Sequence, residues 1–224
     1  MKLKVIKFQL AVILLSCIFI SASAQTNKEE AIDRISKAID KEFINPEIFD
    51  QVSKEQVPNF VKLRQKVRKK YGPIADRLML TAISRFFYIK SYYLPSSAKF
   101  VTDRTETVTN KYLKDFIKYK NELLKKYPDS IDATTLNADA WYVFWNSANE
   151  RHLAFALTWI ESAIKQAPDD LYYLDTKANI LYKLGHNDEA LSLQRKAASN
   201  GHEELQNNLR KMEAGQPTWF VPTI

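Results

Sequence analysis

Apolar residues along this chain recur mainly at the spacing of α-helices. Ala31, Ile32 and Ile35 lie on one helix face, with polar residues between them. The stretch from 74 to about 94 is apolar around most of its circumference, as in a helix buried at the centre of a bundle. A loop is expected to begin at Leu94. Further helical stretches follow over 105–124, 131–148, 151–168, 171–184 and 187–200. The pattern predicts an all-α fold.

Small residues repeat with a period of 34 positions in the second half of the chain. Ala156 is followed by Ala190, and Ala163 by Ala197, each 34 residues later. Two antiparallel helices approach closely only where small side chains lie at the crossing. Gly185 separates two helix-length segments, and glycine is the residue that most easily ends a helix in a left-handed conformation. The spacing therefore predicts stacked helix hairpins.

The segment 171–198 resembles a tetratricopeptide repeat (TPR). The positions that carry the resemblance are Leu174, Ala178, Leu181, Gly185, Asp188, Glu189, Ala190, Lys196 and Ala197. The preceding unit matches only in its second half, because its first helix carries Trp141, Phe144 and Trp145 and no small residue at the usual crossing. The resemblance implies an antiparallel helix-hairpin (TPR-like) solenoid with a degenerate N-terminal helical half.

Residues 136–198 have a second resemblance, to the helical C-terminal region of certain bacterial envelope proteins that carry a thioredoxin-like domain upstream. This chain departs from that pattern, because it has no C-x-x-C motif and no length for a thioredoxin fold before the helices. Thiol chemistry is therefore not carried over. What the resemblance implies is an accessory or remnant subunit of an envelope thioredoxin-like thiol-redox system.

The first 24 residues have the three parts of a secretory signal peptide. Three lysines precede a 13-residue apolar run over 8–20, and the sequence Ala-Ser-Ala at 22–24 gives a small-x-small cleavage pattern. We expect a signal peptide over 1–24, cleavage after Ala24, and a periplasmic or secreted protein. The alternative is a lipoprotein leader anchored at Cys17, the only cysteine of the chain.

Cleavage of the leader changes the chemistry of the chain. The mature protein would have no cysteine, which excludes structural disulfides and thiol catalysis. The formal net charge would fall from +7 to +4, because three lysines and no acidic residue are lost. So mild a charge does not favour nucleic-acid binding. The apolar run is too short to span a bilayer, so we expect no stable membrane insertion after cleavage.

The helical pattern breaks at residues 127–130, Tyr-Pro-Asp-Ser. We therefore expect an N-terminal helical region over 25–130 and TPR-like repeats with a capping helix over 131–214. The polar residues of 202–214 suit the cap that a helical array needs. The tail, 215–224, is apolar for a chain end. Its Trp219 and Phe220 either fold back onto the last helices or form an exposed docking peptide.

A basic cluster precedes the most apolar stretch of the chain. It consists of Lys62, Arg64, Lys66, Arg68, Lys69 and Lys70. Either these residues form a solvated helix face, or they form a patch for an acidic partner or anionic lipid headgroups. The apolar residues between them are too interleaved with charge for a membrane-inserted helix.

The sequence contains no motif for catalysis or for metal or phosphate binding. We therefore expect a protein that is not an enzyme and that holds no cofactor or metal. In TPR arrays the first helix of each unit lines the concave face, so the resemblance implies a peptide-binding groove. Its side chains would be Trp141, Trp145, Tyr172, Asp175, Asn179 and Tyr182. The alternatives are core packing for the two tryptophans and plain solvent exposure for Asp175 and Asn179.

Two functional hypotheses follow. The first is an exported, non-enzymatic module that binds a peptide or protein in the TPR-like groove through a few aromatic anchors. An exposed surface from Trp141 to Tyr182 would favour it, whereas a groove filled by the C-terminal tail would count against it. The second is the accessory or remnant subunit of a thiol-redox system, which predicts association with a separate thioredoxin-like protein.

Overall fold

The computed structural model describes residues 29–38, 41, 57, 59–97 and 106–219. The predicted leader, with its cleavage site and Cys17, lies outside these residues, as does Phe220. Every regular element in the described part of the chain is a helix, which confirms the predicted all-α class. None of the helices in this part combines the length and the apolar character needed to cross a bilayer.

The chain divides into two compact units, residues 1–82 and 83–224, and the division falls within helix α4 (Ile74–Ser97). This helix includes Leu94–Ser97, so the prediction that a loop begins at Leu94 is wrong. Pro95 lacks a backbone donor, and a helix can run past a proline at some cost in stability.

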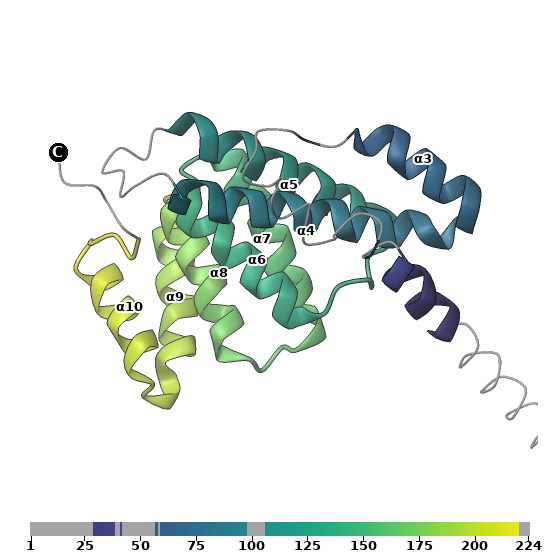
Figure 1. Ribbon diagram of the computed structural model, residues 1–224. Coiled ribbons are helices and arrows are strands. Elements are labelled where there is room, and N and C mark those ends of the chain that lie inside the picture. The colour runs from purple at the N-terminus through teal and green to yellow at the C-terminus, as the bar shows by residue number, and fades with distance from the viewer. Residues whose placement is uncertain (1–28, 39–40, 42–56, 58, 98–105, 220–224) are drawn as a thin grey trace, which may run out of the picture. The chain divides into compact units, whose positions relative to one another are not determined.

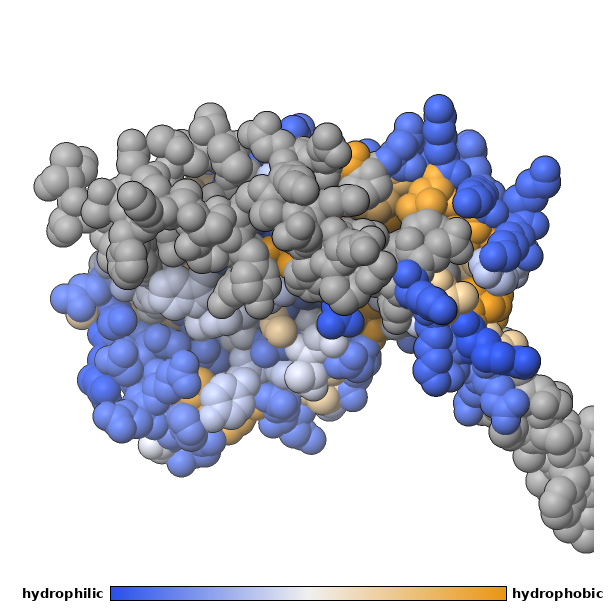
Figure 2. All heavy atoms as spheres, viewed as in Figure 1, coloured by the Kyte–Doolittle hydropathy of each residue, from blue (hydrophilic) through white to orange (hydrophobic). Residues whose placement is uncertain are grey.

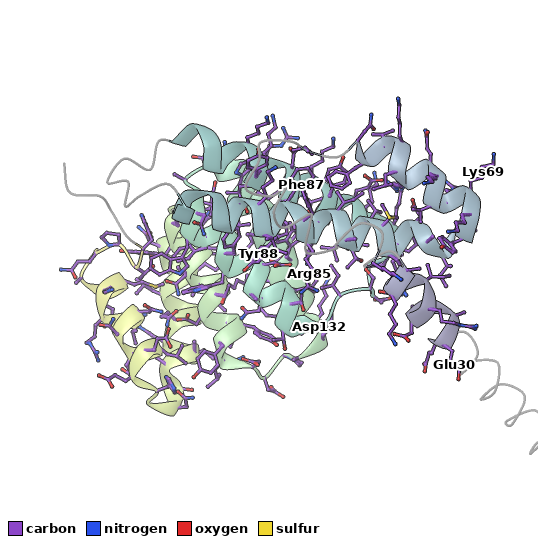
Figure 3. All side chains as sticks on the ribbon, in the orientation of Figure 1. Glu30, Lys69, Arg85, Phe87, Tyr88 and Asp132 are labelled. Atoms are coloured by element: carbon purple, nitrogen blue, oxygen red, sulfur yellow. The ribbon has the colours of Figure 1, made fainter. Side chains whose placement is uncertain are left out.

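The first unit contains the basic helix α3 (Phe60–Tyr71). The helix begins after Asn59, whose side chain accepts a hydrogen bond from the backbone N–H of Lys62. Arg64 donates two hydrogen bonds to the carboxylate of Asp76, which joins α3 to the first turn of α4. Lys69 points away from α3 into solvent in Figure 3.

The second unit begins with aromatic contacts between three helices. Phe87 and Tyr88, labelled in Figure 3, extend from α4 toward α5 (Glu106–Lys126) and α6 (Ala133–Asn146). Phe87 stacks on Tyr119 of α5 with ring centres 5.5 Å apart, and Tyr88 meets Tyr142 of α6 at 4.7 Å. The hydroxyl of Tyr142 also shares a 2.8 Å hydrogen bond with Ser91. These contacts hold the C-terminal half of α4 against α5 and α6.

Two polar contacts fix α5 against its neighbours. Lys120 of α5 forms an ion pair with Asp139 of α6, and both side chains are largely buried. Trp159 of α7 (Glu150–Gln166) is fully buried, and its indole N–H donates to the side chain of Asn121 at 2.8 Å. The charges of Lys120 and Asp139 and the indole N–H of Trp159 thus each have a partner, as burial in an apolar core requires.

The C-terminal helices pack as consecutive pairs, α6 with α7 and α8 (Leu171–Lys183) with α9 (Asn187–Ala197). A 3₁₀ turn over Ala198–Asn200 leads to α10 (Glu203–Glu213), which packs on α9 and α8. Helices α7 to α10 therefore lie side by side in chain order (Figure 1). On the face shown in Figure 2, the surface over α9 and α10 is mostly hydrophilic.

The four alanines of the 34-residue period are all fully buried. The pair from α7 is Ala156 and Ala163, and the pair from α9 is Ala190 and Ala197. Gly185 ends α8 with φ +85°, and the next residue donates its backbone N–H to the Leu181 carbonyl at 3.0 Å. This bond closes the helix in the manner expected of a left-handed glycine, and it turns the chain into α9.

Candidate binding surface

Three aromatic side chains in the last two turns of α6 contact one another. Trp141 stacks on Phe144 with ring centres 5.0 Å apart, and Trp145 meets Trp141 and Phe144 edge-on at 5.8 and 5.7 Å. Trp141 lies three and four positions before Phe144 and Trp145, so it shares a helix face with each of them. Phe144 is fully buried, Trp141 is half-buried, and Trp145 is 41% exposed. The group therefore extends from the core to solvent.

The end of α10 directs the chain back toward this group. Gly215 adopts φ +68°, and its N–H donates to the Met212 carbonyl at 3.1 Å. The N–H of Gln216 donates to the Lys211 carbonyl at 2.8 Å. These two bonds form a Schellman motif, in which glycine reverses the chain direction with the least strain.

The tail that follows places a fourth ring beside α6. Thr218 is buried, and Trp219 packs edge-on against Phe144 at 6.2 Å and against Tyr182 of α8 at 6.1 Å. Tyr182 in turn donates its hydroxyl to the Met212 carbonyl at 3.4 Å. We call Trp141, Phe144, Trp145, Tyr182 and Trp219 the aromatic cluster; it joins α6, α8 and the tail.

Lys183 lies inside the aromatic cluster. Its ammonium group is 5.0 Å from the centre of the Phe144 ring and 5.3 Å from that of Trp219, and it donates to the Phe144 carbonyl at 2.5 Å. Burial lowers the pKa of Lys183 to about 8, because the charged form loses hydration. The two ring faces oppose this effect, since they attract a cation.

A separate group of polar side chains is buried between α8, α9 and α10. The carboxylate of Asp175 accepts hydrogen bonds from Gln194 at 2.6 Å and from Asn208 at 3.0 Å. Asn179 donates to the backbone carbonyl of Asp175 at 2.8 Å. Asn179 and Gln194 are fully buried, and their side-chain oxygens have no hydrogen-bond partner among the described residues. We call these four residues the buried polar cluster.

Burial dominates the electrostatics of Asp175. Loss of hydration raises the pKa of its carboxyl group, while the hydrogen bonds from Asn208 and Gln194 oppose the shift and nearby Glu204 adds to it. Because the carboxylate of Asp175 joins α8 to α9 and α10 through hydrogen bonds, its contacts are those of a residue that stabilises helix packing. The side chain is 5% exposed, so little of it reaches solvent.

The structure thus distributes the six residues predicted to line a groove over three places. Trp141, Trp145 and Tyr182 come together in the aromatic cluster. Asp175 and Asn179 lie in the buried polar cluster. Tyr172 is exposed at the first turn of α8, where its hydroxyl shares a 2.8 Å hydrogen bond with His202. Tyr172 and Tyr182 are ten residues apart, about 15 Å along the helix.

The predicted groove does not include Phe144 and Trp219 of the aromatic cluster, or Lys183, which lies inside it. The apolar tail was the only signal for Trp219, since folding back was one of its two interpretations. Lys183 had no distinguishing signal, because a lysine in the last turn of a helix is common. In the described part of the chain, no group of three His, Cys, Asp or Glu side chains is placed to hold a metal ion.

Comparison with known proteins provides no relative. No protein-family model matches the chain, and the searches of curated proteins and of solved structures return no match.

Proposed function

We propose that this chain is an exported, non-enzymatic module that binds a peptide or protein segment on the aromatic cluster of α6 and α8, within a TPR-like arrangement of helix hairpins. The observation that carries the proposal is Trp145, which is 41% exposed although it contacts two other rings. Aromatic residues at the boundary between core and solvent are frequent anchors in protein interfaces.

The packing of the cluster supports a recognition role for Trp145. Its ring is already held by Trp141 and Phe144, so the Trp145 side chain would lose little additional conformational freedom when a partner contacts it. The buried alanines and the consecutive helix pairs agree with the helix-hairpin arrangement that the 34-residue period predicts. Against an open groove stands Trp219, which covers part of Tyr182 and Phe144. The surface proposed to contact a partner is therefore the Trp141–Trp145 side of the cluster, which Trp219 does not contact in the ring pairs above.

The experiment is affinity capture from the cell envelope of the producing organism with three forms of the protein. Wild type is compared with Trp145→Ala and with Tyr172→Ala, a matched control because Tyr172 is 43% exposed but pairs with His202. The proposal expects a partner that Trp145→Ala loses and Tyr172→Ala retains. Retention by both variants would overturn it. A thioredoxin-like protein as the partner would favour the accessory-subunit alternative.

A further inference from the structure

The tail of the chain occupies part of the surface to which binding is assigned. Trp219 is the only ring of the aromatic cluster that comes from outside α6 and α8. Gln216 and Pro217 on its N-terminal side are exposed, so this segment contributes little burial apart from Thr218 and Trp219. Among the residues of the tail that the structure describes, the Trp219 indole therefore provides much of the contact with the cluster.

We infer that Trp219 is an intramolecular occupant of a site whose external ligand is a peptide bearing a tryptophan, and that the tail must leave before this ligand binds. The inference rests on the proposed function. It names the chemistry of the partner and adds a means of regulating access.

The chemistry around Trp219 specifies the kind of ring that fits. The Lys183 ammonium group lies 5.3 Å from the indole centre, and the rings of Phe144 and Tyr182, inclined to the indole by 88° and 62°, provide the other walls. A cation favours the electron-rich face of tryptophan over those of tyrosine and phenylalanine. A leucine or valine of similar reach has no such face, so this position selects an indole in the ligand.

The connection between α10 and Trp219 makes the tail a strong competitor. Only four residues lie between Trp219 and Ala214, the C-cap of α10, so the indole is held near its site at an effective concentration in the millimolar range. A peptide in solution competes with this tethered ring. If the tail itself binds this site with an intrinsic dissociation constant of about 100 μM, an effective concentration of about 1 mM should weaken the apparent binding of a free peptide by roughly tenfold.

The test uses the full chain and a fluorescent peptide of residues 214–224 as the probe. Binding is measured by anisotropy to wild type and to Trp219→Ala. The inference expects at least about tenfold tighter binding to Trp219→Ala, and a matching peptide with its tryptophan replaced by alanine should bind neither protein. Equal binding to both proteins would overturn the intramolecular occupancy and leave the proposed function standing. No binding to a correctly folded Trp219→Ala would overturn the assigned ligand chemistry.

A second measurement needs no variant of the tail. The wild-type chain is labelled with 5-fluorotryptophan, and the ¹⁹F signals are followed as the unlabelled peptide is added. The signal of Trp219 should move toward the value of an exposed tryptophan, whereas that of Trp159, fully buried and bonded to Asn121, should stay in place. A stationary Trp219 signal at saturating peptide would contradict displacement of the tail.

Discussion

The ammonium group of Lys183 lies 5.3 Å from the centre of the Trp219 ring, so a charged group in the last turn of α8 is in contact with the C-terminal tail. The same amine donates to the Phe144 carbonyl at 2.5 Å. The tail thus covers a cation as well as apolar rings. Its removal should change the ionisation of Lys183 in a measurable way.

Replacing Trp219 with alanine should raise the pKa of Lys183 from about 8 toward the ordinary lysine value, because the amine regains water. The measurement is an NMR titration of the lysine side-chain carbons between pH 6 and pH 11. Trp145→Ala is the control, since Trp145 is not one of the rings over which the amine lies, and it should leave this pKa unchanged. An unchanged pKa in Trp219→Ala would show that the tail does not desolvate Lys183.

Lys183 should also make stability depend on alkaline pH. Its pKa is lower in the folded chain, about 8, than the ordinary lysine value of 10.5, so the unfolded chain binds more protons between these values. The stabilisation is therefore present above about pH 10.5 and is lost as the pH falls through about 8. Relative to Lys183→Met, wild type should gain stability from pH 8 to pH 10.5 in urea unfolding. Parallel pH profiles would refute this.

The stability contributed by Asp175 depends on pH in the opposite direction to that of Lys183. Its pKa is raised by burial, so the stability it contributes is present below the ordinary carboxyl pKa of 3.8 and is lost as the pH rises through the folded value. Asp175→Asn keeps an acceptor for Gln194 and Asn208 without the charge. This variant should leave the free energy of unfolding at pH 7 unchanged or increase it. Asp175→Ala should cost about 1–3 kcal/mol for each donor left unpaired.

Denaturant unfolding of both Asp175 variants at pH 4 and pH 7 checks this account. The difference in stability between wild type and Asp175→Asn should grow in favour of the variant as the pH rises. A strongly destabilised Asp175→Asn at pH 7 would mean that the charge itself holds α8, α9 and α10 together.

The pair Lys120–Asp139 allows a third test of buried charge. Asp139→Ala should destabilise by about 3–5 kcal/mol, because it leaves the Lys120 ammonium buried without its partner. The double variant Lys120→Met with Asp139→Leu should recover most of this loss, since the two apolar side chains need no hydration. Thermal unfolding of the single and double variants measures the recovery. A double variant as unstable as Asp139→Ala would contradict the argument.

Much of the fold could be predicted from local sequence because its determinants are local. The 34-residue spacing of Ala156 and Ala190 anticipated two buried positions, and Gly185 marked the end of α8. Small side chains and left-handed glycines have the same meaning in any helical protein. The all-α class follows from the same helical periodicity.

The candidate site was less predictable because it depends on packing between distant segments. A polar Asp175 in an amphipathic helix is compatible with solvent exposure, and only the positions of Gln194 and Asn208, on two other helices, explain its burial. Trp219 reaches Tyr182 from 37 positions away. Such contacts leave no periodic signal in the sequence.

The most direct test of the account is selection from a random peptide library displayed on phage, with Trp219→Ala as the bait and Trp219→Ala/Trp145→Ala as the comparison. We expect the enriched peptides to share a tryptophan and the added Trp145→Ala substitution to abolish the enrichment. Enriched peptides without an aromatic residue, or peptides retained equally by both baits, would contradict binding at the aromatic cluster.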